Sequence, residues 1–104
     1  MKVIWLPLAK TQLRQTALYI FKEFGKKRKD EFLNEIKDAN RLIGSNPYMG
    51  KPEFLLDDYP ELYRSYLVNS LNKIVYCEIN NQIEVSAFWD VRRDPNILAD
   101  QQKK

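Results

Sequence analysis

Apolar residues recur every three or four positions in two segments, which is the period of an amphipathic helix. The first stripe stops at Gly25 and consists of Ala9, Leu13, Ala17, Ile20, Phe21 and Phe24. The second stops at Gly44-Ser45-Asn46-Pro47 and consists of Phe32, Ile36, Ala39 and Ile43. The pattern predicts one helix over about residues 7–24 and a second over about 28–44. Because the connection is short, we expect an antiparallel hairpin with both stripes on a common partner.

Runs of β-branched and aromatic residues predict the strands. A short run, Val3–Trp5, precedes the first helix, and three longer runs occupy residues 62–68, 73–79 and 82–91. Asn80-Asn81 separates the last two and suits a tight hairpin, because Asn tolerates left-handed backbone. Residues 45–60 contain three prolines and show no period, so we expect an irregular crossing loop there.

The predicted order of elements is β-α-α-β-β-β. This order indicates an α+β fold in which a helical hairpin packs on one face of an antiparallel sheet. A length of 104 residues suits a single domain over about residues 1–100, and we expect residues 101–104 to fray. The predicted core contains Trp5, Leu13, Phe21, Phe32, Ile36 and Trp89.

Composition narrows the function classes. Hydrophobic residues make up 44% of the chain, so it should fold without a metal or a disulfide. Cys77 is the single cysteine and histidine is absent, so we expect no metal site and no cofactor. We interpret Cys77 as an inert core residue in a reducing, cytoplasmic protein. No signal peptide is evident, and no apolar run approaches the roughly 20 residues that span a bilayer.

Charge is unevenly distributed along the chain. The net charge is +3, and one short segment holds Lys22, Lys26, Lys27, Arg28 and Lys29. A later segment is acidic, with Glu53, Asp57, Asp58 and Glu61. These runs predict that one end of the fold is positive. The alternative is that they are ordinary solvated turns.

The order of several short motifs resembles one known family. Trp5, Ala9 and Leu13 enter the first helix, Tyr19-Ile20 lie near its end, and Pro47 and Gly50 follow the second. Later motifs are Tyr63-Arg64, Val75-Tyr76 and the closing sequence Trp89-Asp90-Val91-Arg92-Arg93-Asp94-Pro95. Over about residues 3–95 this arrangement resembles the RelE/ParE superfamily, the toxins of type II toxin-antitoxin modules, which serve in plasmid stabilization and growth inhibition.

The resemblance implies one of two activities. RelE-like members are endoribonucleases that cut messenger RNA on the ribosome, whereas ParE-like members share the fold and inhibit DNA gyrase with no known catalytic set. Either activity implies a cognate antitoxin as partner, with DNA gyrase or the ribosome and its mRNA as target. We expect the antitoxin to be acidic and partly disordered, and to cover the groove of the hairpin or add to a sheet edge.

RNA cleavage needs a general base, a general acid and cations that stabilise the transition state. Arg64, Arg92 and Arg93 match positions at which cleaving relatives bind phosphate, and we expect Arg64 and one of the pair to converge on the concave face of the sheet. Where many relatives place a histidine, this chain has Asp90. Glu53, Glu61 and Asp90 are the candidate bases.

Three functions therefore stay open. The ParE-like toxin, which is not an enzyme, is favoured, because the histidine, the lysine-rich loop and the C-terminal tyrosine or histidine of cleaving relatives have no clear counterpart. The RelE-like mRNA endoribonuclease is the first alternative, and a non-toxic basic binding module on the same fold is the second. The predicted contact residues are Arg64, Arg92 and Arg93 together with Lys26, Lys27, Arg28 and Lys29.

Overall fold

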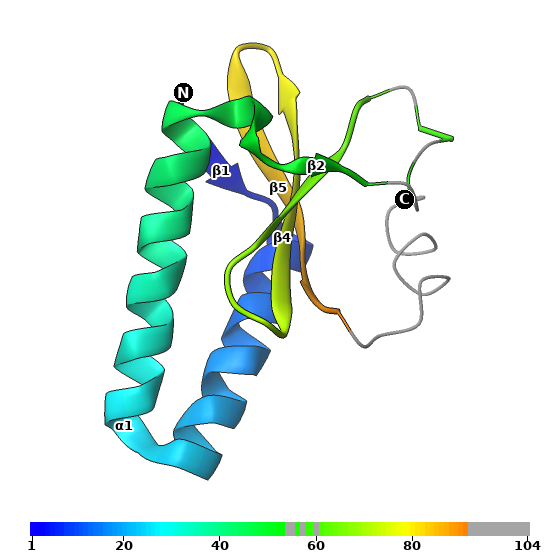
Figure 1. Ribbon diagram of the computed structural model, residues 1–104. Coiled ribbons are helices and arrows are strands. Elements are labelled where there is room, and N and C mark those ends of the chain that lie inside the picture. Colours follow the sequence, from blue (N-terminus) through cyan, green and yellow to red (C-terminus); the bar gives the residue numbers. More distant parts are fainter. Residues whose placement is uncertain (54–55, 57, 60, 92–104) are drawn as a thin grey trace.

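The computed structural model describes residues 1–53, 56, 58–59 and 61–91. The elements are β1 (Val3–Trp5), α1 (Pro7–Ser45), the 3-10 helix η1 (Pro47–Met49), β2 (Lys51–Pro52), β3 (Arg64–Leu67), β4 (Asn72–Ile79) and β5 (Gln82–Asp90). The strands form one sheet in the order β1-β5-β4-β3-β2, and α1 folds back on itself over one face of it (Figure 1). The α+β fold class is confirmed.

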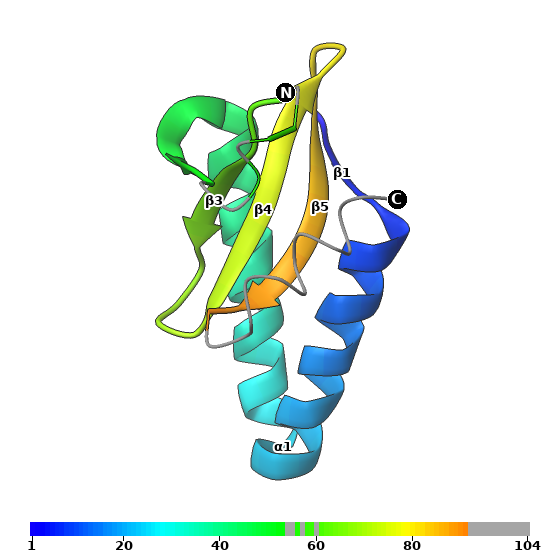
Figure 2. The same ribbon diagram turned by 90° about the vertical axis from the view of Figure 1, so that its right-hand side faces the viewer.

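The predicted hairpin forms, with a tighter connection than expected. α1 runs from Pro7 to Ser45 and leaves helical geometry at Gly25, where φ is 89° and ψ is 178°. Glycine reaches this region without the steric cost that a Cβ imposes, so one residue turns the chain. The predicted gap over residues 25–27 is therefore wrong, and two arms lie antiparallel on either side of a single-residue bend (Figures 1 and 2).

The last three strands form the predicted antiparallel meander. Asn80 and Asn81 have φ values of 54° and 62°, as a two-residue hairpin with two left-handed positions requires. The sheet as a whole is mixed, because β1 pairs in parallel with β5 (Val3 opposite Ile83). β2 lies inside the segment over residues 45–60 that we expected to be irregular, and it pairs with β3. Runs of β-rich sequence locate strands but leave their pairing order undetermined.

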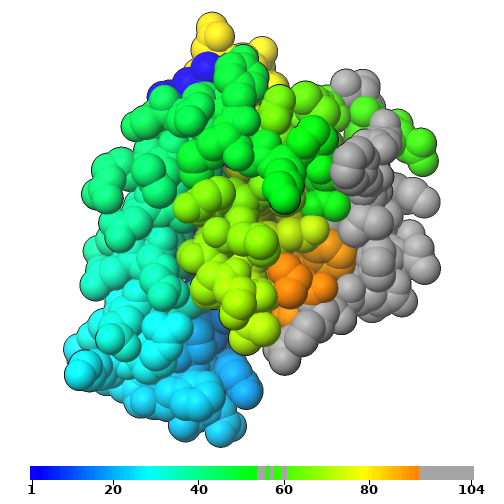
Figure 3. All heavy atoms as spheres, in the orientation of Figure 1, coloured from blue at the N-terminus to red at the C-terminus, as the bar shows by residue number. Residues whose placement is uncertain are grey.

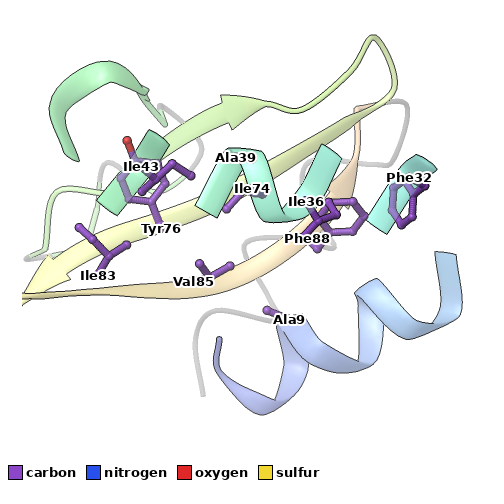
Figure 4. Close-up of a cluster of buried hydrophobic side chains, with 10 residues drawn as sticks. All are labelled: Ala9, Phe32, Ile36, Ala39, Ile43, Ile74, Tyr76, Ile83, Val85 and Phe88. Carbon is purple, nitrogen blue, oxygen red and sulfur yellow. The ribbon is translucent and has the colours of Figure 1, made fainter. Parts of the chain in front are cut away.

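The main core lies between α1 and the sheet. Figure 4 shows the second-arm stripe of Phe32, Ile36, Ala39 and Ile43 facing side chains of β4 and β5. Val75 lies opposite Ala87 and Tyr76 opposite Val85, so Ser86 is the extra residue of a β-bulge. The bulge places both Val85 and Phe88 in the core beneath the helices. The Phe32 and Phe88 rings meet edge to face at 5.8 Å.

Most of the predicted core is confirmed. Phe32 and Ile36 are buried in the main core, and Trp5 and Leu13 are half-buried against it. Trp89 is also buried, on the opposite face of the sheet. Phe21 is 46% exposed, so its prediction as a core residue is wrong. The hairpin bend projects past the strands as a separate lobe (Figures 1 and 3), and the apolar stripe there has no sheet to cover. No helix within the described residues has the length and apolar character to cross a bilayer.

Candidate functional site

A cavity of about 540 Å³ opens between the two arms of α1 and the turn that joins β3 to β4. Its walls include Tyr19 and Phe24 from the first arm, Arg28 from the second, the turn residues 69–72, and Asp90 at the end of β5. This volume is in the range of pockets that bind small molecules or single side chains of a partner. It is therefore a candidate functional site.

The turn that closes the cavity is held by its own side chain. The amide oxygen of Asn69 accepts hydrogen bonds from the backbone N–H groups of Leu71 (2.9 Å) and Asn72 (3.0 Å). The N–H of Val91 donates to the carbonyl of Leu71 at 2.8 Å, which fixes the turn to the end of β5. Asn is suited to this role because its side chain satisfies backbone donors two and three residues onward.

Two predicted site residues that lie far apart in the sequence both line this cavity. Arg28 and Asp90 both line it, which makes it a polar opening beside the apolar Phe24 and Phe32. Arg28 Nη1 also lies 3.8 Å from Glu35 Oε2, so part of its charge is balanced within α1. The cavity thus combines one cation, one carboxylate and several aromatic rings.

Two lysines at the hairpin bend, Lys26 and Lys29, share one carboxylate of the same helix, that of Asp30. Lys26 Nζ donates to Asp30 Oδ2 at 2.7 Å, and that hydrogen bond lowers the pKa of Asp30. Lys29 lies 3.9 Å from Asp30 and stacks over the ring of Phe21. Both ion pairs are exposed, where such contacts contribute little to stability. The positive segment seen in the sequence is therefore a mixed-charge lobe in space.

Arg64 lies away from this cavity, on the side of the sheet that carries the helices. Its Nη1 donates to the carbonyl of Gly50 at 2.9 Å, and its guanidinium carbon lies 5.3 Å from the centre of the Tyr48 ring. Arg64 is opposite Tyr76 on β4, whereas Asp90 is opposite Asn72. Four residues of strand separate these positions by roughly 13 Å. The structure does not bring Arg64 and Asp90 together.

Tyr76 organises the contacts around Arg64, and sequence analysis did not identify this role. Its hydroxyl donates to the carbonyl of Pro47 at 2.7 Å and accepts from the N–H of Gly50 at 3.1 Å. A Cβ at position 50 would lie 2.5 Å from that hydroxyl, which explains a glycine there. Burial raises the pKa of Tyr76. A tyrosine in a later strand and a Pro-x-x-Gly segment are both too common in sequences to predict such a contact.

The sheet face opposite the helices carries a second apolar cluster. Val75, Ala87 and Trp89 are buried there beneath Leu56, with Tyr59 and Tyr63 at the margin. Lys73 reaches this face, where its ammonium lies 2.6 Å from Glu53 Oε2 and 4.7 Å from the centre of the Trp89 ring. Glu53, one of the candidate bases, is 7% exposed and held by this contact.

The remaining candidates are distributed as follows. Glu61 is exposed, and together with Glu84 it adds to the effect of burial, which raises the pKa of the Cys77 thiol to about 11. Cys77 is buried, in agreement with its predicted role as a core residue. Arg92, Arg93 and the tail over 101–104 lie outside the described residues.

Comparison with known proteins identifies the family. A family model described as the ParE toxin of type II toxin-antitoxin system, parDE, matches residues 3–95. The chain belongs to the ParE toxin family. A search of curated proteins finds no match. Among solved structures, the chain resembles one from the chromosomal ParDE TA system of P. aeruginosa, with a TM-score of 0.71 and 12% identity, over 88% of this chain and 97% of that one.

The family assignment can now be set beside the positions of the candidate residues. The resemblance to RelE/ParE toxins that the sequence suggested is confirmed, and it implies an antitoxin partner. Within the described residues, Arg28 and Asp90 share a cavity, Arg64 binds backbone carbonyls, and Glu53 binds Lys73. These side chains thus lie in three separate surroundings.

Proposed function

We propose that this chain is a cytoplasmic toxin that inhibits an essential machine by binding to it, as ParE-like toxins inhibit DNA gyrase, and that a cognate antitoxin neutralises it. The family places the chain among type II toxins. The choice of binding over catalysis is our own inference. It rests on the arrangement of the candidate residues described above.

The observation that carries the proposal is the apolar character of the sheet face opposite the helices. Cleavage of RNA through its 2′-hydroxyl requires acid-base groups and cations around one phosphate. On this face the chain instead buries Val75, Ala87 and Trp89, and the cation Lys73 is paired with Glu53. A phosphate drawn to Lys73 would have to displace a carboxylate that is 7% exposed.

The test is induced expression of the full chain, with and without the gene beside its own. We expect the chain alone to arrest growth and co-expression of its neighbour to restore it. Pulse labelling then separates the targets: early loss of DNA synthesis supports gyrase, and early loss of protein synthesis contradicts the proposal in favour of the ribosome. Normal growth with abundant folded protein would support a non-toxic binding module instead.

One observation supports the alternative of a RelE-like endoribonuclease. Arg28 and Asp90 both line the cavity of about 540 Å³, so a cation and a carboxylate border the same opening. If the chain cuts mRNA there, Asp90→Asn should abolish toxicity and leave binding to the antitoxin unchanged. Cleaved transcripts mapped after induction would decide for this alternative, and intact transcripts during growth arrest would decide against it.

A further inference from the structure

The cavity between the arms of α1 and the β3–β4 turn has a polar wall that contains a cross-strand pair. Asn72 on β4 lies directly opposite Asp90 on β5, and both residues line the cavity. Side chains in this relationship lie on the same face of a sheet, with their Cβ atoms about 5 Å apart. The side-chain amide of Asn72 forms no hydrogen bond within the described residues, and a carboxylate accepts several. The pair therefore presents a hydrogen-bond donor beside an acceptor.

Aromatic rings from the first arm of α1 form a second wall. Tyr19 and Phe24 line the cavity and are 59% and 65% exposed. Their ring centres lie 6.4 Å apart with an angle of 77° between the planes, so the edge of one ring supports the face of the other. Phe32, which is fully buried, also borders the cavity. Accessible aromatic faces are stacking surfaces for nucleobases, because every base has a π-face.

Arg28 supplies the positive charge of the cavity. It is half-buried, and its ion pair with Glu35 is 3.8 Å long, which is beyond hydrogen-bond distance. Its planar fork of N–H donors is therefore available to an anion, and this fork matches a phosphate with two parallel hydrogen bonds. Lys22 and Lys27 belong to the same bend and take part in no ion pair within the described residues, so they add to the positive potential.

We propose that this cavity, whose volume of about 540 Å³ suits such a ligand, binds a nucleotide. The base stacks on Tyr19 and Phe24. The amine of a base such as adenine donates to Asp90, and the neighbouring ring nitrogen accepts from Asn72. Arg28 binds the phosphate. A free nucleotide and one unit of a single-stranded nucleic acid both carry this chemistry. The inference goes beyond the proposed function, because binding here involves no cleavage and holds whichever cellular machine the chain inhibits.

The test is titration of the full chain with adenosine monophosphate, followed by calorimetry and by NMR of the backbone amides. We expect saturable binding with a Kd below about 1 mM, and shifts centred on the turn residues 69–72 and on Tyr19 and Phe24. Ribose phosphate lacks the base and adenosine lacks the phosphate, so each should bind at least about tenfold more weakly. An oligoadenylate of about six nucleotides separates the two sources of the ligand. Tighter binding than that of the monophosphate assigns the cavity to a single strand, and equal or weaker binding assigns it to the free nucleotide.

Matched variants separate binding in this cavity from general attraction to a basic protein. Arg28→Gln and Lys27→Gln make the same change in net charge, and only Arg28 lines the cavity. Tyr19→Leu and Phe21→Leu each remove one exposed ring, and only Tyr19 lines the cavity. The two cavity variants should weaken binding at least about tenfold and the two controls less than about threefold, with melting temperatures near that of wild type.

Three results overturn the proposal: no binding of adenosine monophosphate, equal weakening by the control variants, or amide shifts centred on another surface. Loss of antitoxin binding in Tyr19→Leu, together with no nucleotide binding by wild type, would overturn it in favour of a partner protein that fills the cavity.

Discussion

The ammonium of Lys73 lies 2.6 Å from Oε2 of Glu53, in a contact whose two side chains are 16% and 7% exposed. Lys73 belongs to β4, and Glu53 directly follows β2. The contact lies on the sheet face that carries the second apolar cluster. The Trp89 ring, 4.7 Å from the same ammonium, adds a cation-π contact. Removing one member of such a buried pair destabilises the fold, because it leaves the other charge buried without a partner.

We expect Lys73→Met to destabilise the fold by about 3–5 kcal/mol, because the Glu53 carboxylate stays buried without the ammonium. Urea unfolding of the full chain measures the change. The double variant Lys73→Met with Glu53→Gln removes both charges and should recover at least half of the loss. Equal midpoints for wild type and Lys73→Met would show that the contact contributes nothing in solution.

The core prediction can be tested with two phenylalanines of α1. Phe32 is fully buried and Phe24 is 65% exposed. Phe32→Ala should cost about 3–5 kcal/mol, a large share of the stability of a small domain, whereas Phe24→Ala should stay within about 0.5 kcal/mol. The two variants lose the same atoms, so their denaturation midpoints compare burial directly. Similar losses for both would mean that the hairpin bend packs against something in solution.

Sequence alone gave the helices, the meander and the fold class, because each depends on local periodicity or on turn residues. The stripe through Phe32 and Ile36 follows the helical period, and Asn80-Asn81 marks the hairpin by its backbone preference. Phe21 continues the first stripe equally well, yet it is exposed. Periodicity identifies the face of a helix and says nothing about how far the opposing sheet extends.

The candidate site was harder to predict for a related reason. The cavity with Arg28 and Asp90 forms where the bend of α1 passes the β3–β4 turn, so it depends on tertiary placement. The contact between Lys73 and Glu53 likewise joins residues that no local pattern connects. Arg64 was identified as a contact residue, but its carbonyl partners belong to a segment without any period. Long-range polar contacts leave no signature in a single sequence.

Gly25 permits a test of the bend. Its φ of 89° and ψ of 178° lie in a region that is essentially restricted to glycine, and an added Cβ would meet nothing within 4 Å. Gly25→Ala should therefore cost about 1–3 kcal/mol through backbone strain alone. Thermal unfolding measures this cost. A variant as stable as wild type would show that the bend relaxes into a conformation that other residues tolerate.

Cys77 predicts a dependence of stability on alkaline pH. Burial is the main reason that its pKa rises from 9.0 to about 11, with Glu84 and Glu61 contributing. The folded state therefore favours the neutral thiol. This contribution is complete below pH 9 and is lost as the pH rises through about 11, up to about 2–3 kcal/mol. Urea midpoints at pH 8 and pH 10.5 should differ less for Cys77→Ala than for wild type. An equal difference would assign the loss to other groups, such as Tyr63 and Tyr76, whose pKa values burial also raises.

Arg64 separates a residue that holds the fold from one that contacts a target. Its guanidinium donates to the carbonyl of Gly50, and Gly50 is tied to Tyr76, so Arg64→Ala should cost about 1–3 kcal/mol by leaving a half-buried acceptor without its donor. Arg64→Lys keeps the charge but loses the planar fork, and should fall between alanine and wild type. Growth arrest should then decline only as far as the amount of folded protein declines. Arg28→Ala with Asp90→Asn is the comparison in the cavity: growth arrest that falls while the melting temperature stays near that of wild type would favour the endoribonuclease alternative. Folded Arg64→Ala that has lost all toxicity would contradict this assignment, and would place Arg64 on the target-binding surface as the resemblance to RelE/ParE toxins first implied.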